Sequence, residues 1–342
     1  MGRGLAILGI FAVLIGAYVY CGPMELSITP RRPAAGQREV TAETATETNK
    51  STASVAPVRK TESTPDEAKR RDSVLVVTPA VATSALGALP EKAIPGFPPA
   101  PQKSFSHDQL ASVMKQAKQL RASGHLMEAR DLLSDAYLAN RLTKDQRLRL
   151  ADELEPLAWE VLRSRNILDH GQLYEVGSGD LLGKISKRLQ VSPEFIVKLN
   201  DLKSAKSIRP RQMLKLVNGP FDVLVELSEF ELTVLHFGAF VCRYTVGIGR
   251  EESPTPVGLY KVNTKLIDPV YFGAGAPPVP AKARENPLGS RWIDIGLGYG
   301  IHGTYEPETI GQRSSRGCVR LTNEDVEELY DMLTEGSRVL IR

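Results

Sequence analysis

The pattern of hydrophobic residues changes several times along this chain of 342 residues, which argues against a single domain. An uncharged run opens the chain, and a polar stretch follows it. Residues with helical spacing come next, and short β-type segments fill the rest. Because a domain typically holds ~100–200 residues, this length also favours several domains with linkers. We therefore expect a multidomain protein in which each pattern marks one part.

The N-terminus, residues 1–26, predicts a membrane anchor. Arg3 precedes an uncharged apolar run from Leu5 to Tyr20. As a helix this run would span about 24 Å at ~1.5 Å per residue, slightly less than a ~30 Å hydrocarbon core. Tyr18 and Tyr20 stand where a leader-peptide cleavage site needs small residues. We expect an uncleaved single-pass helix in the cell membrane, with the rest of the chain outside the cytoplasm in the periplasm or cell wall. A cleaved signal peptide is the alternative.

Residues 27–104 predict a disordered linker. The stretch from Thr41 to Thr64 is rich in Thr, Ala, Glu, Ser and Lys and has no apolar period, and several prolines follow it. Such a segment cannot bury enough apolar surface to offset its ordering entropy. We expect a tether that lets the folded part reach away from the membrane.

Residues 105–170 predict an α-helical spacer. Ser106 with Gln109 forms a capping box, the pattern that begins a helix. Thr143 with Gln146 forms a second capping box. Three apolar stripes with helical spacing follow, and the first two weakly resemble one tetratricopeptide unit. Because a solenoid needs several repeats to bury its core, a plain spacer is favoured over a repeat that binds a protein partner.

The charge and cysteine content exclude several classes of function. The 43 basic and 40 acidic residues leave a net charge of only +3, which gives no basis for nucleic-acid binding. The three cysteines lie far apart without metal-ligand spacing, so we expect no metal and no disulfide framework. A free thiol in an exported protein suggests that the thiol has a function, and catalysis is one such function.

Residues 172–218 predict a small module of strand, helix, helix and strand. Tyr174 begins the first strand, and we expect Asp180 to cap the first helix. Ser192 precedes Pro193 at the first position of the second helix, a strong start signal. An apolar run near Leu216 closes the module as a strand.

This segment resembles a LysM module along its whole length. The matching residues are Gly179-Asp180, Ile185, Val191-Ser192, Leu199-Asn200, Leu202, Ile208-Arg209-Pro210 and Gln212. The resemblance implies binding of N-acetylglucosamine-containing glycans such as peptidoglycan through two loops. The implied contact residues are Gly179, Asp180 and Leu181 in the first loop and Ile208 and Arg209 in the second. Leu181 and Arg211 depart from the residues usual in the family, and a module used only as a spacer is the alternative.

Residues 221–342 predict a mainly-β domain. Short alternating or apolar segments are separated by glycine breaks and by the turn signal at Thr255-Pro256-Val257-Gly258. The stretch from Asp268 to Pro287 has no regular period, and a loop of that length in a compact domain is more often functional than accidental. Cys242 and His236 lie inside expected strands, so we expect both to be structural.

The last third of this domain carries a constellation suited to nucleophilic catalysis. A thiol of pKa ~8.5 is little ionised at neutral pH, although the thiolate is the attacking form. His302 follows a strand and could take the proton of Cys318. Gly317 lets the backbone approach a substrate closely, and Arg320 adds positive charge that favours a thiolate or binds a carboxylate. Thr322 then caps a helix that fixes the chain after the nucleophile.

Residues 221–342 resemble the L,D-transpeptidase (YkuD-like) catalytic domain throughout. The matching residues are Thr255 through Gly258, Asn286 through Gly289, Arg291-Trp292, His302-Gly303-Thr304, Ile310-Gly311, Ser315 through Leu321, and Asn323. The resemblance implies a β-sandwich-like fold with a capped helix after the nucleophile. It also implies that Cys318 is the nucleophile, that His302 is the base, and that the carbonyl of Gly303 orients the imidazole.

The same resemblance implies further site residues. The amides of Gly317 and Cys318 are oxyanion candidates, and Ser315, Arg316 and Arg320 would shape the site or bind substrate. Arg316 replaces a histidine that many family members carry, which leaves His302 as the one candidate base in the motif.

The implied reaction is acyl transfer on peptidoglycan stem peptides without a cofactor. The thiol would attack the bond between the third stem residue and its terminal D-alanine, and an amine of a second stem would resolve the thioester to a 3→3 cross-link. Water as acceptor would give a carboxypeptidase, and a protein amine would anchor a protein to the wall. A catalytically silent glycan-binding tether is the alternative from another class.

Overall fold

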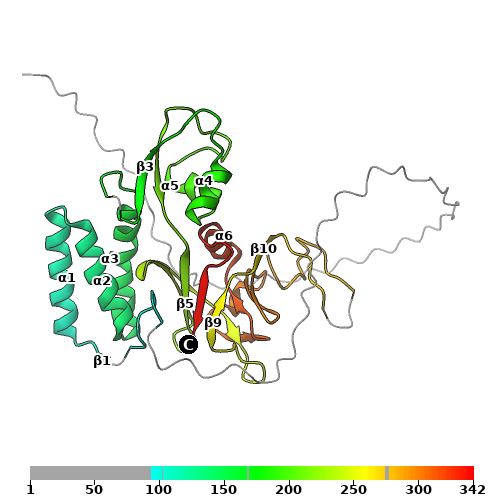
Figure 1. Cartoon of the computed structure of the whole chain (residues 1–342). Helices are drawn as coiled ribbons and strands as arrows, with labels where there is room; N and C mark the ends of the chain where they lie inside the picture. The colour runs from blue at the N-terminus through cyan, green and yellow to red at the C-terminus, as the bar shows by residue number, and fades with distance from the viewer. Residues whose placement is uncertain (1–93, 102, 168, 274–276) are drawn as a thin grey trace, which may run out of the picture. The chain divides into compact units, whose positions relative to one another are not determined.

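The computed structural model describes residues 94–101, 103–167, 169–273 and 277–342, all of which fall within one compact unit (Figure 1). The expected membrane anchor and most of the expected linker lie outside these residues. Across the described ranges, no helix is both long and apolar enough to cross a membrane.

The C-terminal domain is built mainly from two β-sheets. The first sheet has the strand order β7-β6-β5-β15-β9, formed by Ala239–Thr245, Glu231–His236, Phe221–Glu226, Arg338–Ile341 and Gly258–Lys261. The second has the order β10-β11-β12-β14, formed by Thr264–Ile267, Arg291–Gly296, Tyr299–His302 and Val319–Arg320. A separate parallel pair joins β8 (Ile248–Gly249) to β13 (Arg313–Ser315), and η1 is a 3₁₀ turn at Pro307–Thr309. The mainly-β prediction is therefore confirmed.

Both sheets and the helix α6 (Asn323–Met332) share one hydrophobic core. The side chains of Val223 and Val234 from the first sheet meet Ile293 and Ile301 from the second, with Val326 of α6 among them. Alternate residues such as Leu224 and Leu235 point to the other face of the first sheet, into a second cluster. Because β5 and β6 are buried on both faces, they read as nearly continuous apolar runs in the sequence.

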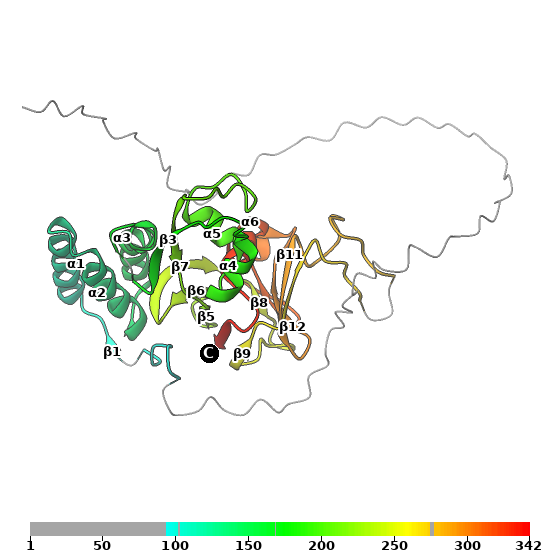
Figure 2. The same cartoon turned by 45° about the horizontal axis from the view of Figure 1, so that its top comes forward.

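Three helices cover that second face: α1 (His107–Ala122), α2 (Leu126–Ala139) and α3 (Lys144–Arg163). Both expected capping boxes are present, at Ser106 and at Thr143. The contacts of α2 and α3 are with β7, and both views show the helices on that side of the sheet (Figures 1 and 2). The expected spacer therefore packs onto the β domain, because the apolar stripes of the helices meet the second face of the sheet.

The end of the expected linker is also part of the folded unit. Residues 94–101 lie against the β domain, where Arg338 donates to the Pro95 carbonyl at 2.6 Å and Arg342 donates to the Pro98 carbonyl at 3.0 Å. The Arg338 guanidinium also lies over the ring of the buried Phe97. A two-residue strand β1 (Lys103–Ser104) then pairs in parallel with β2 (Asn140–Arg141). Residues 94–101 and 103–104 were therefore wrongly assigned to a disordered segment, because Arg338 and Arg342 bond the carbonyls of Pro95 and Pro98 and β1 pairs with β2.

The small module has the expected order of elements: β3 (Gly171–Glu175), α4 (Leu182–Leu189), α5 (Pro193–Leu199) and β4 (Met213–Val217). Ser192 caps α5 as expected, with its hydroxyl accepting from the Phe195 N–H at 2.9 Å. The expected cap by Asp180 is wrong. Leu181 is the N-cap of α4, and the Asp180 carboxylate instead accepts from the Gly177 N–H and the Tyr174 hydroxyl, each at 2.7 Å.

The module is fastened to the β domain through α5. The Ser192 hydroxyl donates to the Asp331 carbonyl at the end of α6, and Lys198 forms an ion pair with the Asp331 carboxylate at 2.7 Å. The rings of Phe195 and Phe221 meet edge to face, with centroids 4.8 Å apart. Figure 2 shows α5 beside α6, in agreement with their contacts.

A buried charge network joins the helices to the sheet and gives a test of this architecture. Arg147 of α3 lies 2.9 Å from Glu231, which also accepts from the Tyr137 hydroxyl at 2.7 Å. We expect Arg147→Ala to lower the free energy of unfolding by about 3–5 kcal/mol, because it removes the nearer of the two arginines that neutralise the buried Glu231 carboxylate and leaves only Arg243 at 3.4 Å. Urea unfolding of the purified protein measures this loss.

The matched control is Arg149→Ala on the same helix. Arg149 pairs with Asp145, but these two side chains are 53% and 70% exposed. The control should therefore change the free energy of unfolding by less than about 1 kcal/mol. Equal effects of the two substitutions would contradict a stabilising role for the buried network.

Candidate active site

The strand pair β12–β14 brings the expected nucleophile and base to one face of a sheet. The parallel register pairs Ile301 with Val319 and His302 with Arg320. Cys318, one residue before β14, therefore stands opposite Gly300. Because side chains alternate along a strand, Cys318, Arg320 and His302 point to the same face of two strands ~4.8 Å apart. The thiol and the imidazole are thus diagonal neighbours.

Trp292 on the adjacent strand β11 contacts both groups. Its ring stacks on His302 with centroids 5.7 Å apart, and Cys318 packs against the cluster that Trp292 forms with Leu288. A Cβ on Gly300 would lie 2.5 Å from the Trp292 ring, so only glycine fits between that ring and the thiol. The indole forms one wall of the site, a role that the sequence motif alone did not reveal.

The imidazole of His302 is buried and held in one tautomer. Its Nδ1 lies 2.7 Å from the Gly303 carbonyl oxygen. Because a carbonyl only accepts, Nδ1 carries the hydrogen and Nε2 keeps its lone pair. The pKa of His302 is lowered to about 4, chiefly by burial; the Gly303 hydrogen bond opposes this shift and the charge of Arg320 adds to it. The imidazole is therefore neutral and able to accept a proton at neutral pH.

The loop before the nucleophile is held by Ser315. Its hydroxyl donates to the Cys318 carbonyl at 2.6 Å and accepts from the Gly317 N–H at 3.1 Å. Gly317 has a φ of 108°, and a Cβ there would lie 2.6 Å from the Tyr299 ring, so this position requires glycine. The Gly317 amide is therefore already engaged, which corrects its assignment as an oxyanion donor. The Cys318 N–H has no hydrogen-bond acceptor among the described residues.

Cys318 as a residue is partly exposed, but its sulfur is largely buried and the thiol stays protonated in the free protein. Burial of the sulfur raises the pKa of Cys318 to about 11. A backbone hydrogen bond from Gly300 and the charge of Arg320 lower that pKa, whereas Asp294 raises it. In the resting protein, a neutral thiol therefore lies beside a neutral imidazole. We expect the thiol to lose its proton only when a substrate is bound.

Two arginines of the motif occupy different environments. Arg320 is mostly buried, its one ion-pair partner is Glu306 at 3.7 Å, and its Nε has no hydrogen-bond partner in the described part of the chain. Burial lowers the pKa of Arg320. Arg316 is exposed on the loop between β13 and β14. Arg320 therefore places a largely buried positive charge at the site, whereas Arg316 stands at its rim.

Asn323, the first residue of α6, ties the base to a neighbouring loop. Its Oδ1 accepts from the Ser290 N–H at 2.9 Å. A Cβ on either Gly289 or Gly303 would lie 2.2 Å from the same oxygen. The amide side chain thus fills the space that these two glycines leave open and fixes the turn that carries the Gly303 carbonyl. The two glycines at strand ends were the sequence signal for this contact.

The expected glycan-binding residues lie in the small module, apart from this constellation. Gly179 and Arg209 are exposed, and Leu181 is 57% exposed. Ile208 instead packs partly against the core. Hydrogen bonds from Tyr174 and Gly177 lower the pKa of Asp180, whose carboxylate shapes the first loop.

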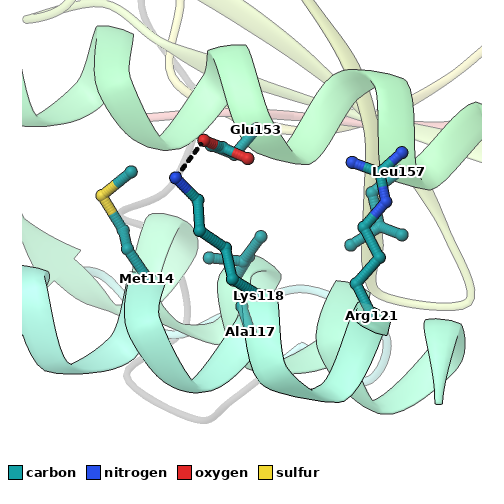
Figure 3. A pocket seen from close by; sticks show the side chains of 7 residues that line it. Met114, Ala117, Lys118, Arg121, Glu153 and Leu157 are labelled. Carbon is teal, nitrogen blue, oxygen red and sulfur yellow. Dashed lines mark ion pairs between the residues drawn. The ribbon is translucent and has the colours of Figure 1, made fainter. Parts of the chain in front are cut away.

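The helical layer has a crevice between α1 and α3 (Figure 3). Met114 and Leu157 line it, and Lys118 reaches across to Glu153 at 2.9 Å. The cavity measures only about 10 Å³, room for one water molecule at most. No group of His, Cys, Asp and Glu side chains in the described ranges could hold a metal ion.

Comparison with known families assigns both modules. Residues 220–341 match the model of the L,D-transpeptidase catalytic domain, and residues 174–217 match that of the LysM domain.

Individual relatives agree with this assignment. "Putative L,D-transpeptidase YqjB" of Bacillus subtilis is 35% identical over 129 residues, which cover 35% of this chain and 69% of that protein. "Putative L,D-transpeptidase YkuD" of the same organism is 26% identical over 49% of this chain and 97% of that protein. "Probable L,D-transpeptidase YbiS" of Escherichia coli is 36% identical over 28% of this chain and 35% of that protein.

Among solved structures, the chain is similar to L,D-transpeptidase 3 from Mycobacterium tuberculosis in complex with a faropenem-derived adduct. The two share 21% identity and a TM-score of 0.32, over 39% of this chain and 64% of that one, so the match spans less than two thirds of the solved chain.

The protonation state of Cys318 predicts how it reacts with iodoacetamide. Because the thiolate is the reactive form and the pKa is about 11, the alkylation rate should rise about tenfold per pH unit from pH 7 to 10. The fully buried Cys242 should stay unmodified, because burial raises its pKa as well. Peptide mass spectrometry measures both sites. A rate that levels off by pH 8 would contradict a protonated resting thiol.

Proposed function

The chain belongs to the L,D-transpeptidase family, and from that premise we propose that it cross-links peptidoglycan through a thioester on Cys318. The observation that carries the proposal is the arrangement of the Cys318 thiol beside a neutral imidazole whose Nδ1 is fixed on the Gly303 carbonyl. This tautomer leaves Nε2 as the proton acceptor on the face that it shares with the thiol. No other side chain of the described motif offers a base in this position.

The acylation step uses these groups in order. His302 Nε2 takes the thiol proton as the sulfur attacks the carbonyl that joins the third stem residue to its terminal D-alanine. The Cys318 N–H, which has no acceptor among the described residues, donates to the oxyanion. The imidazolium then gives its proton to the leaving amine, so D-alanine departs and a thioester remains.

The deacylation step reverses these roles. An amine of a second stem attacks the thioester, and His302 removes its proton as the thiolate leaves and is protonated again. The product is a 3→3 cross-link. Arg320, whose side chain lies on the face that the thiol and the imidazole share, is the group that would hold a stem carboxylate during both steps.

The other parts of the chain would bring the active site close to the peptidoglycan. We propose that the LysM module binds glycan strands through its exposed residues Gly179, Leu181 and Arg209. We further propose that residues 1–26 anchor the chain in the cell membrane with the enzyme outside the cytoplasm. The uncharged apolar run within those residues supports this placement.

The reaction is tested with peptidoglycan fragments and with faropenem. The wild-type chain should form a covalent adduct and should give 3→3 cross-linked muropeptides from tetrapeptide stems. Cys318→Ala should abolish both, and Cys242→Ala should retain both because that thiol lies in the core. Intact-protein mass and muropeptide analysis are the measurements. Released tripeptide without dimers would replace the proposal with a carboxypeptidase.

The buried imidazole predicts the acid limb of the pH profile. A base works only when it is neutral, so activity falls as pH drops through its pKa, which burial places at about 4. The kcat/KM of the wild type should therefore persist well below pH 6. Trp292→Leu should admit water to His302, raise its pKa and move the acid limb toward ~6.5. A wild-type limb near 6.5 would contradict the buried base.

A further inference from the structure

The buried charge of Arg320 has one loosely placed ion-pair partner in the part of the chain that the structure describes. Glu306 lies 3.7 Å from the Arg320 guanidinium, and the Glu306 side chain is 67% exposed whereas that of Arg320 is 15% exposed. This separation exceeds the length of a hydrogen bond. An ion pair with one partner in water contributes little, because solvent screens it. The guanidinium is therefore only partly neutralised in the empty site.

The surroundings of Arg320 hold further positive charge. Burial lowers the pKa of Arg320; the charge of Glu306 opposes this shift, and the charge of Arg250 adds to it. Arg250 is exposed and forms no ion pair within the described ranges. Two guanidinium groups thus share one exposed carboxylate, an arrangement that favours the binding of another anion.

Glu306 can release Arg320 without a change in its loop. The Glu306 N–H donates to the Thr304 hydroxyl at 3.0 Å. The Glu306 carbonyl accepts from the Thr309 N–H at 3.0 Å and from the Thr309 hydroxyl at 2.7 Å. The backbone is thus fixed on both sides of this residue, while the exposed carboxylate can rotate away about its own side-chain bonds.

Arg320 is close enough to the reacting groups to position a substrate. It follows Cys318 by two residues, so their Cα atoms lie roughly 6.6 Å apart along the strand. Arg320 also pairs in register with His302, and its charge acts to lower the pKa values of both groups. In the proposed donor stem, the terminal carboxylate belongs to the residue that directly follows the scissile carbonyl. A carboxylate held by Arg320 would therefore bring that carbonyl close to the sulfur.

We propose that Glu306 is a built-in counter-ion of Arg320 that the terminal carboxylate of the donor stem displaces. The stem then replaces a long, solvent-screened contact with a direct, charge-assisted hydrogen bond. Glu306 competes with the stem and so weakens its binding. Glu306 also disfavours ligands that lack the carboxylate, because they cannot replace the ion pair that they break. This inference deepens the proposed function and rests on it.

The test measures binding to the full chain by calorimetry in a Cys318→Ala background, which prevents turnover. Glu306→Gln is compared with Glu308→Gln, which removes the same charge from the same loop but breaks no ion pair with a described residue. The ligands are a glycan-free tetrapeptide stem and the same peptide with a C-terminal amide. Glu306→Gln should tighten binding of the carboxylate peptide about two- to fivefold and leave binding of the amide unchanged. Glu308→Gln should change neither.

Kinetics with Cys318 intact supply the second measurement. Glu306→Gln should lower the KM of the free tetrapeptide by the same factor and leave kcat unchanged, because the Glu306 contact is already broken in the bound state. Equal effects of the two substitutions, an equal effect on the amide peptide, or no binding by any variant would overturn the displacement. Selective tightening in a chain that never turns over a stem would support the displacement and sink the proposed function.

Discussion

The site depends on the parallel pairing of two very short strands, β12 and β14. This register sets Cys318 opposite Gly300 and places Arg320 beside His302, so the thiol, the imidazole and the guanidinium share one face. A shift by one residue would turn the thiol to the other face of the sheet, because the side-chain period of a strand is two. Ser315 and Asn323 secure the two ends of this arrangement, one through the nucleophile loop and the other through the turn after His302.

Burial sets the electrostatic state of the site. It lowers the pKa of His302 and raises that of Cys318, so both groups rest in their neutral forms. The resting chain therefore avoids the desolvation cost of a buried thiolate–imidazolium pair. It also keeps the thiolate fraction low, which protects the sulfur from oxidation. The Cys318 N–H, which has no acceptor among the described residues, is then free to donate to the oxyanion of the proposed reaction.

Much of the fold could be predicted, because its signals are local. The capping boxes at Ser106 and Thr143, the Ser192-Pro193 start and the alternating strands each depend on neighbours a few residues away. The strands β8, β13 and β14 were missed, since two or three residues cannot show a period. The Asp180 cap failed because the Tyr174 hydroxyl and the Gly177 amide compete for the same carboxylate.

The reactive residues of the site could be predicted from the sequence, whereas the residues that support them were harder to predict. Cys318 follows His302 by 16 residues, within one recognisable sequence motif. The contacts that Trp292 and Asn323 make cannot be deduced from the motif itself. The only sign of these contacts in the sequence is the glycines that leave room for the two side chains. The placement of residues 94–101 depends on Arg338 and Arg342 near the other end of the chain, a sequence separation that no local pattern can bridge.

The attachment of Pro95 and Pro98 to these arginines has a mechanical consequence. Arg338 begins β15 and Arg342 follows it, and β15 lies between β5 and β9 in the larger sheet. Tension that reaches residue 94 from the N-terminal side would therefore load β15 before it reaches α1. β15 is hydrogen-bonded in parallel to β5 and antiparallel to β9, so it is held on both sides and resists such a load better than the end of a helix resists unravelling.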